Sequence, residues 1–295
     1  MLNVKHLNQV YLYTALVFLS ISLSSAGDAQ EPVVNQSNNP ILQSFSWRGI
    51  GPIGQGGRVD DLAVSKENPH VYFVGFATAG LWKTKNNGTT FKAVFETHPT
   101  SSVGAVAISD ANADIVWVGT GEANNRQSSS FGAGVYLSTD AGETFDLAGL
   151  EETQSISRIL THPTDPNVAW VAANGHLFGA NPERGVYKTT DRGSSWEKVL
   201  YVDENTGATD LIIDPSNPDV LFAATYQRRR TACCFVGGGP GSGIWHSSNG
   251  GNDWSRVEGN GLPKGTMGRI ALATSQANPN VIYAQIEVAQ DKEES

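Results

Sequence analysis

The 295-residue chain is acidic, with 20 Lys and Arg against 29 Asp and Glu, a net charge of −9 and only 17% charged residues. A net negative charge repels a phosphate backbone, so the composition argues against a nucleic-acid partner. The 32 glycines and the lack of helix-forming stretches after the N-terminus favour one large all-β domain, for which we expect neither a cofactor nor a metal.

The N-terminus has the pattern of a secretory signal peptide. Lys5 precedes an apolar run over residues 10–23, and residues 24–26 are small enough for a cleavage site. The run is short for a bilayer span, although an uncleaved N-terminal anchor is the alternative. We expect a signal peptide over residues 1–26, a secreted or periplasmic mature protein, and no membrane span after cleavage. Residues 27–43 are polar and are expected to form a flexible leader.

The rest of the chain, residues 44–295, contains a two-strand unit that occurs five times. Each copy is an apolar strand, a short polar turn and a second apolar strand, and four of the five turns contain Asn-Pro or Asp-Pro. The copies lie at residues 62–74, 106–118, 159–171, 211–223 and 272–284. Paired apolar strands joined by such turns predict antiparallel β-hairpins.

A second hairpin motif follows each of the first four copies, with the consensus Ser/Thr-x-Asp/Asn-x-Gly-x-x-aromatic. Its Asp or Asn residues are 54, 51 and 58 residues apart. The Asp or Asn side chain is expected to cap the turn, the Gly to accept positive φ, and the aromatic to pack across the hairpin. The residues with these structural roles are Asn86, Gly88, Phe91, Asp140, Gly142, Phe145, Asp191, Gly193, Trp196, Asn249, Gly251 and Trp254.

Together the two hairpins predict a four-stranded antiparallel blade, with strands A to D running from the axis outward. Blades of about 50 residues are typical of a β-propeller, whereas a β-sandwich would not explain four hairpins in phase. Five A–B pairs against four motif hairpins correspond to about four and a half blades, an incomplete ring. Residues 44–47 are one candidate for an outer strand of the last blade. Missing blades would come from a longer chain or from another subunit.

The two cysteines, Cys233 and Cys234, are adjacent in the sequence. Neighbouring cysteines rarely bridge each other without strain, so we expect two small residues in a loop rather than a disulfide framework. No other cysteine is present to complete a metal site with them.

Long loops between strands B and C mark the face where a ligand site is expected, opposite to the motif hairpins. Three of these loops are long, at residues 119–134, 174–185 and 226–243, and long loops on a rigid scaffold commonly carry function. Their Arg, Glu and Asn side chains suit sugars or carboxylate-bearing ligands, although the arginines would equally tie neighbouring loops together. The ligand-binding candidates are Arg58, Glu122, Asn125, Arg126, Arg158, His176, Arg184, Asp210, Arg228 and Arg230.

Asp61, Arg158 and Asp210 fall in one column when the A strands are aligned. This position lies near the start of the innermost strands, around the central axis. The three residues are expected to form either part of a ligand site or a ring of ion pairs that closes the axis.

The hairpin motif resembles the Asp-box, or bacterial neuraminidase repeat. Longer stretches, among them residues 119–122 and 183–191, resemble the bacterial sortilin-like Asp-box proteins that often carry a glycosyl hydrolase label. The resemblance covers about residues 47–287 and implies a multi-bladed propeller like that of the sortilin luminal domain and, more distantly, of the family-74 xyloglucanases. Members of the group are longer, which implies that the chain is the N-terminal part of a larger propeller.

The resemblance to xyloglucanases allows one residue-level comparison. Their catalytic Asp lies in a Thr-Asp-Ile-Gly-Gly segment, and residues 76–82 match that segment here, with Ala77 in the Asp position. The two-carboxylate mechanism thereby lacks one partner. We therefore favour a non-catalytic binding module for a protein or carbohydrate ligand. A glycoside hydrolase that uses Glu122 or Glu183 is the alternative.

Overall fold

The computed structural model describes residues 33–34, 40, 46–47, 57–126, 129–259 and 261–289. The chain divides into two units, Met1–Gln55 and Gly56–Ser295. The expected signal peptide and most of the expected leader lie outside the described residues. The described residues include no helix that is long and apolar enough to cross a membrane.

In the first unit, β1 (Val33–Val34) pairs with β2 (Ser46–Trp47) as a two-stranded antiparallel sheet. Residues 44–47 are the candidate for an outer strand of the last blade, and the structure describes residues 46 and 47 of them. The structure instead gives them β1 as their partner, and the last blade contains two strands.

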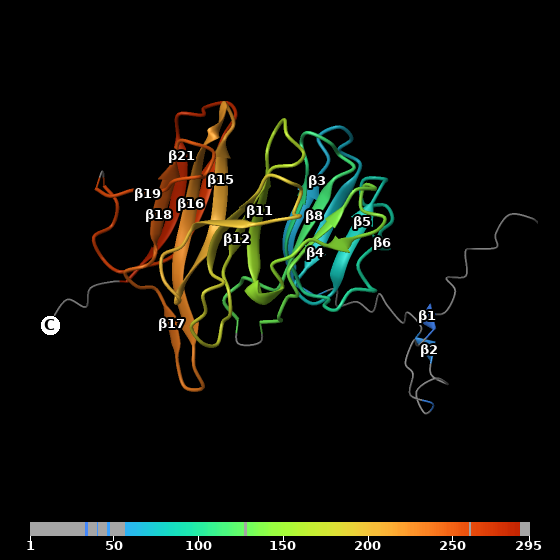
Figure 1. Ribbon diagram of the computed structural model, residues 1–295, viewed down its shortest axis with the longest axis horizontal. Coiled ribbons are helices and arrows are strands. Elements are labelled where there is room, and N and C mark those ends of the chain that lie inside the picture. Colours follow the sequence, from blue (N-terminus) through green and yellow to red (C-terminus); the bar gives the residue numbers. More distant parts are fainter. Residues whose placement is uncertain are drawn as a thin grey trace, which may run out of the picture. The chain divides into compact units, whose positions relative to one another are not determined.

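The second unit consists of successive antiparallel sheets whose strands pair in chain order (Figure 1). Blade 1 contains β3 (Val59–Val64), β4 (Tyr72–Phe76), β5 (Gly80–Thr84) and β6 (Lys92–Ala93). Blade 2 contains β7 (Val103–Ile108), β8 (Val116–Thr120), β9 (Val135–Ser138) and β10 (Asp146–Leu147). A short 3-10 helix, Glu151–Thr153, leads to blade 3, which contains β11 (Ile156–Thr161), β12 (Ala169–Ala173), β13 (Gly185–Thr189) and β14 (Glu197–Leu200).

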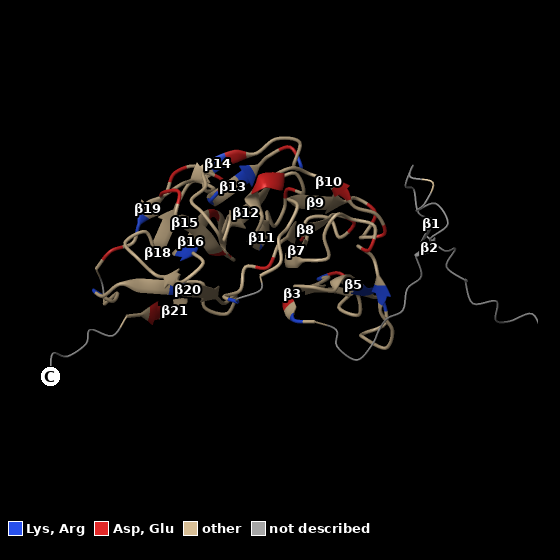
Figure 2. Cartoon of the chain, turned by 90° about the horizontal axis from the view of Figure 1, so that it is seen from below, with Lys and Arg blue, Asp and Glu red and all other residues tan. Residues whose placement is uncertain are grey.

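The last two sheets differ from this pattern. Blade 4 contains β15 (Thr206–Asp214), β16 (Asn217–Arg230), β18 (Gly243–Ser247) and β19 (Ser255–Arg256), and β17 (Phe235–Gly237) pairs with the end of β16. In blade 5 the described residues form two strands, β20 (Met267–Thr274) and β21 (Ile282–Val288). In Figure 2 the five sheets form an arc with blades 1 and 5 at its two ends. The predicted propeller of about four and a half blades, with an incomplete ring, is confirmed.

All four Asp-box hairpins have the same hydrogen-bond network. In the second, Ser138 Oγ donates to Asp140 Oδ1 over 2.7 Å, and the Gly142 N–H donates to Ser138 Oγ over 2.8 Å. Hydrogen bonds from the hydroxyl and N–H of Thr144 hold the pKa of Asp140 well below its usual range. Equivalent bonds to the capping side chain close the hairpins at Asn86, Asp191 and Asn249. The carboxylates of the Asp-boxes are therefore occupied by their own turns.

Three of the Asp-box glycines also lock consecutive blades together. Each packs on an aromatic ring in strand B of the preceding blade: Gly142 on Phe73, Gly193 on Trp117 and Gly251 on Trp170. A Cβ at Gly142 would lie 2.5 Å from the Phe73 ring, and one at Gly251 would lie 2.7 Å from Trp170 Nε1. Glycine is required here because it combines positive φ, 79° at both residues, with this close approach.

We call the rings at this position of strand B the aromatic column. The column continues in blades 4 and 5, where no described Asp-box glycine packs on the ring. Phe222 and Tyr283 occupy the position in strand B that Trp170 occupies in blade 3, because each lies opposite the equivalent residue of strand A. Trp170 is 1% exposed, whereas Phe222 is half-buried and Tyr283 is 63% exposed. The exposure rises because no described Asp-box hairpin covers these two rings.

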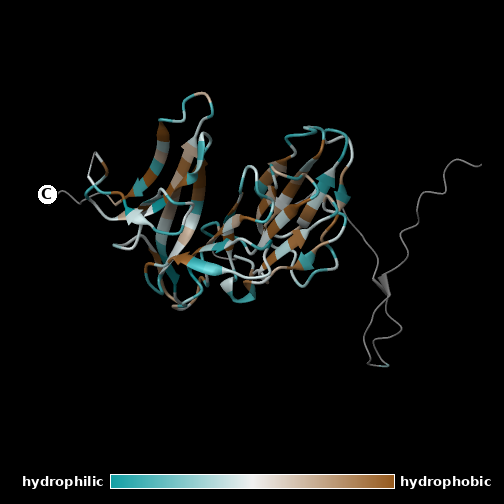
Figure 3. Cartoon of the chain, turned by 45° about the horizontal axis from the view of Figure 1, so that its top comes forward, coloured by the Kyte–Doolittle hydropathy of each residue, from teal (hydrophilic) through white to brown (hydrophobic). Residues whose placement is uncertain are grey.

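The hydrophobic core lies between neighbouring blades rather than in one central cluster. One group of buried side chains joins Phe73 and Leu81 of blade 1 to Val106 and Val118 of blade 2. Similar groups join blades 2 and 3 and blades 3 and 4. Figure 3 shows the resulting pattern, with apolar residues concentrated on the strands and hydrophilic residues in the loops.

Two substitutions in the aromatic column test this interlock within the chain. We expect Trp170→Ala to lower the free energy of unfolding by about 3–5 kcal/mol, because it leaves a cavity beneath the Gly251 turn. Tyr283→Ala removes a mostly exposed ring and is expected to cost less than about 1 kcal/mol. Urea denaturation measures both values, and equal losses would show that Tyr283 is covered in solution.

Candidate functional site

Every innermost strand contains a β-bulge near its start. The A–B pairing skips Asp60 in β3, Gly104 in β7, Ser157 in β11, Thr209 in β15, and Gly268 with Arg269 in β20. A bulge leaves a residue unpaired and re-aims side chains, and bulges are frequent beside binding sites. Because the five bulges occupy equivalent positions, their residues converge on one place.

That place is a cavity of about 150 Å³ at the axis, which we call the axial cavity. Its wall includes Asp60, Gly104, Ser157, Thr209 and Arg269 from the five bulges. Ala123 and Asn124, from the long loop between β8 and β9, complete it on the face of the B–C loops. The cavity has room for several water molecules or for one small polar group.

Ion pairs with Arg158 tie the wall of the axial cavity together. Arg158 Nε lies 3.1 Å from Asp210 Oδ1, and Arg158 Nη1 lies 3.6 Å from Asp61 Oδ1. Each carboxylate also accepts a backbone N–H from the next blade, Asp61 from Val106 over 3.0 Å and Asp210 from Leu272 over 2.8 Å. Asp61, Arg158 and Asp210, which align in the sequence, therefore lie close together in the structure and link neighbouring blades.

Three other groups in the axial cavity keep unused hydrogen-bonding capacity. Asp60 accepts one bond, 2.6 Å from Asn124 Nδ2, and burial, reinforced by the charge of Glu122, raises the pKa of Asp60 to about 6. Arg269 Nη1 donates to Asn124 Oδ1 over 3.1 Å. The buried hydroxyl of Thr209 has no hydrogen-bond partner among the described residues. The Asp60 carboxylate and the Arg269 guanidinium therefore belong to residues that line one small cavity, and the Thr209 hydroxyl is buried in its wall.

Glu122 lies beside the axial cavity but is not accessible. Its two carboxylate oxygens accept from Arg58 Nε over 2.8 Å and Arg58 Nη2 over 2.7 Å, and its side chain is 0% exposed. Its backbone carbonyl accepts from the Ser155 hydroxyl over 3.1 Å. This bidentate pair joins the start of blade 1 to the β8–β9 loop. Because both Glu122 oxygens are bonded to Arg58 and buried, the carboxylate is not open to a substrate.

Arg184 and Arg228 are buried and tie loops together through backbone carbonyls. Arg184 donates to the carbonyls of Asn174, over 2.8 Å, and of His176. Arg228 donates to the carbonyls of Ala123 over 3.0 Å and of Asn124 over 2.8 Å. Burial lowers the pKa of each guanidinium to about 10. Arg228 thereby holds in place the loop that supplies Asn124 to the axial cavity.

The other sequence-predicted candidates lie in the B–C loops, apart from the residues that line the axial cavity. Asn125 donates to the Tyr226 hydroxyl over 3.0 Å, and His176 Nε2 lies 2.8 Å from the Glu152 carbonyl. Glu183 accepts from the Tyr187 hydroxyl over 3.1 Å. Arg126 is exposed, and the Arg230 guanidinium lies over the Phe235 ring. The two catalytic candidates do not share a partner, because Glu122 is bonded to Arg58 and Glu183 to Tyr187.

The expectation for the cysteines was wrong. Cys233 and Cys234 are joined by a disulfide, and both are exposed at the tip of the β16–β17 hairpin. Within the described ranges, no group of three or more His, Cys, Asp or Glu side chains is placed to hold a metal ion.

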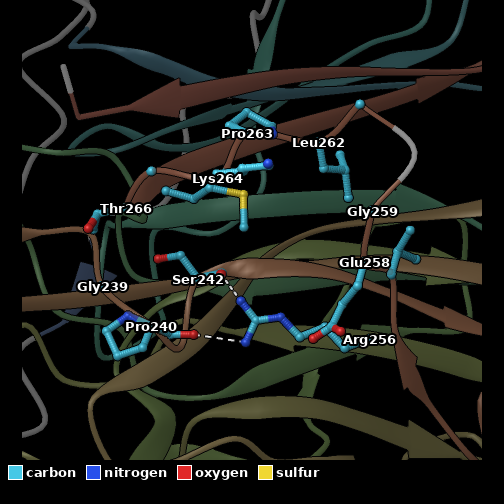
Figure 4. A pocket seen from close by; sticks show the side chains of 14 residues that line it. Gly239, Pro240, Ser242, Arg256, Glu258, Gly259, Leu262, Pro263, Lys264 and Thr266 are labelled. Carbon is cyan, nitrogen blue, oxygen red and sulfur yellow. Dashed lines mark hydrogen bonds between the residues drawn. The ribbon is translucent and has the colours of Figure 1, made fainter. Parts of the chain in front are cut away.

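A larger hollow of about 750 Å³ lies beside blade 5, between the β19–β20 connection and the residues before β18 (Figure 4). Arg256 is its central charged side chain, and it donates to the carbonyls of Pro240 over 2.9 Å and Ser242 over 2.8 Å. The remaining wall includes four glycines and two prolines, together with the exposed side chains of Glu258 and Lys264. Because the Arg256 guanidinium is bonded to these carbonyls and the hollow is open, we place the candidate site at the axial cavity instead.

The chain matches the family model Sortilin-Vps10, described as sortilin, neurotensin receptor 3, over residues 133–294, more than half of its length. The chain belongs to the Sortilin-Vps10 family. The matched range of this family runs from the start of blade 2's strand C to the last blade. The resemblance to sortilin-like Asp-box proteins is therefore confirmed.

Xyloglucanases are similar to parts of the same chain. Xyloglucanase Xgh74A of Acetivibrio thermocellus is 31% identical over 35% of this chain and 12% of that protein. A Paenibacillus xyloglucanase is 22% identical over 94% of this chain and 28% of its own length. The chain thus spans less than a third of either relative.

Solved structures of similar fold include GH74 enzymes. An ancestral GH74 enzyme superposes with a TM-score of 0.58 at 23% identity, over 80% of this chain and 28% of that one. The GH74 xyloglucanase of Xanthomonas campestris gives 0.57 at 14% identity, over 77% and 34%. These likenesses support the propeller fold and the distant resemblance expected from the sequence.

Proposed function

We propose that the protein is a non-catalytic binding propeller that holds one hydroxyl-rich unit of a glycan in the axial cavity. The observation that carries the proposal is that Asp60, Thr209 and Arg269 line one cavity from three different blades, where the Asp60 carboxylate and the Arg269 guanidinium each have one hydrogen-bond partner among the described residues. Sugar hydroxyls both donate and accept, so they match a carboxylate, a hydroxyl and a guanidinium at the same time. The similarity to xyloglucanases makes xyloglucan oligosaccharides the first ligands to test.

The positions of the carboxylates favour binding over hydrolysis. Glycoside hydrolases need two carboxyl groups that flank the scissile bond, about 5–10 Å apart and open to it. Glu122 is paired with Arg58 and buried, and Asp61 and Asp210 each hold a backbone N–H of the next blade. Ala77, which matches the catalytic Asp position by resemblance, is fully buried.

A glycoside hydrolase remains the second candidate because of Asp60. Burial raises the pKa of Asp60 to about 6, a value suited to a general acid near neutral pH. In that alternative Asp60 would protonate the leaving oxygen, and a second carboxylate would have to be released from its present bonds.

Binding of xyloglucan oligosaccharides by calorimetry tests the proposed site. Thr209→Val keeps the shape but removes a buried, unpartnered hydroxyl, so we expect unchanged or higher stability and about three- to tenfold weaker binding. Asp60→Asn is expected to weaken binding by about tenfold or more, because a charged acceptor is lost. Wild-type affinity should fall as the pH drops from 7.5 to 5, since the Asp60 carboxylate protonates with a pKa of about 6.

Asp146→Asn is the matched control, because Asp146 is an exposed carboxylate on the outer strand β10. It should bind as the wild type does. If the wild type, Thr209→Val and Asp60→Asn bind with equal affinity, the axial cavity is not the glycan site.

We also propose that the protein is exported. The N-terminal signal-peptide pattern and the exposed Cys233–Cys234 disulfide support this, because disulfides persist mainly in oxidising compartments. Mass spectrometry of the expressed protein is expected to find a mature N-terminus near Gly27 in the periplasm or medium. Intact residues 1–26 on a cytoplasmic protein would contradict export.

The uncovered aromatics of the last blades support a larger ring in the working protein. We propose that Asp-box hairpins of further blades, from a longer chain or another subunit, cover Phe222 and Tyr283. In such an assembly Tyr283→Ala would become as costly as Trp170→Ala, because the ring would then lie beneath a glycine turn.

A further inference from the structure

The hairpin formed by β16 and β17 projects from the face of the B–C loops (Figure 1). The 14-residue strand β16 continues beyond blade 4, where Arg228 to Arg230 pair with Gly237 to Phe235. The Cys233–Cys234 disulfide joins two residues of the connecting turn. Among the described strands β17 pairs only with β16, so its other edge is unpaired.

Two phenylalanines flank Arg230 near the tip of this hairpin. Arg230 is directly opposite Phe235 in the ladder, and its guanidinium carbon lies 4.9 Å from the centre of the Phe235 ring. On its other side Arg230 forms a β-bridge with Phe178 of the β12–β13 loop, and its N–H donates to the Leu177 carbonyl over 2.9 Å. Phe178 is 48% exposed and Phe235 is 39% exposed. We call Phe178, Arg230 and Phe235 the hairpin patch.

Positive charge is concentrated around the hairpin patch, although the whole chain carries a net charge of −9. Arg228, Arg229 and Arg230 are consecutive, and Arg184 donates to the Arg228 carbonyl over 3.2 Å. Within the described part of the chain, none of these four arginines forms a salt bridge with a carboxylate. Their partners are carbonyls, an amide and an aromatic ring. Arg184 and Arg228 are buried, and the charges of Asp203 and Glu122 act on them, so the partly exposed Arg229 and Arg230 carry the charge that a partner can reach.

We propose that the hairpin patch binds an acidic, aromatic-containing segment of a partner protein. Exposed Phe rings around an Arg are residue types enriched in protein interfaces and at their hot spots. Acidic residues of the partner would pair with the partly exposed Arg229 and Arg230, and the unpaired edge of β17 can accept an extended peptide. The disulfide restricts the hairpin tip, which lowers the conformational entropy lost on binding. This site is separate from the axial cavity and does not depend on glycan binding.

Fluorescence anisotropy with a labelled random copolymer of glutamate and tyrosine tests the proposal on the whole protein. We expect Phe178→Ala and Phe235→Ala each to weaken binding about tenfold, because each removes an exposed aromatic contact. Arg230→Gln should weaken binding by a similar factor, and added salt should weaken wild-type binding because the attraction is between exposed charges.

Matched controls separate a local effect from a general one. Phe91→Ala removes an exposed Phe from an Asp-box hairpin, and Arg126→Ala removes an exposed Arg from another B–C loop. Both should bind as the wild type does, and thermal unfolding should show that all five variants fold. Asp60→Asn should also leave this binding unchanged, which distinguishes the hairpin patch from the axial cavity.

Three results would overturn the proposal. The first is equal binding by the wild type and by the three patch variants. The second is equally tight binding of a lysine–tyrosine copolymer, which would show that the charge of the partner is irrelevant. The third is binding of polygalacturonate, an acidic polysaccharide, that is tighter than that of the acidic copolymer and is lost in the patch variants.

Discussion

The structure depends on the contact between an Asp-box glycine and an aromatic ring of the preceding blade. Gly142, Gly193 and Gly251 each combine a left-handed backbone with close packing on the ring, and at Gly142 and Gly251 the approach is too close for a side chain. The capping Asp or Asn holds that turn in shape, so the hairpin reaches the ring in the same way each time. One short motif therefore sets both the local turn and the spacing between blades.

This interlock holds the blades together at one end, and carboxylates hold them at the other. Asp61 and Asp210 each accept a backbone N–H from the following blade near the axis. Because the bulges bring equivalent positions of all five inner strands to the axis, side chains not used in these links face the same small space. Asp60, Thr209 and Arg269 are those side chains, and they give the axial cavity its mixed polar character.

The sequence predicted the blades well because each turn has a local chemical signature. Asp140, Gly142 and their equivalents recur at a nearly constant spacing, and the aligned column of Asp61, Arg158 and Asp210 proved to be a set of neighbours. A bulge has no such signature. Asp60 directly precedes Asp61, and Thr209 directly precedes Asp210. Only the register shift in the pairing of strands A and B shows that Asp60 and Thr209 line the axial cavity.

Three further features were beyond local sequence reasoning. The burial of Glu122 depends on Arg58, which lies 64 residues away in another blade, so an apparently free loop carboxylate became a structural ion pair. The disulfide between Cys233 and Cys234 contradicts the general expectation for adjacent cysteines, and Phe178 reaches Arg230 from a different blade. For Glu122 and for Phe178 the partner is brought close by the arrangement of the blades, whereas the two cysteines are neighbours in the chain.

The central claim is that the axial cavity binds a glycan without cleaving it. The most direct test is the release of reducing ends from xyloglucan by the wild type and by the Asp60→Asn variant at pH 6, near the pKa of Asp60. We expect the two proteins to release equal, background amounts. Release by the wild type that disappears in Asp60→Asn would contradict it and identify Asp60 as a catalytic acid.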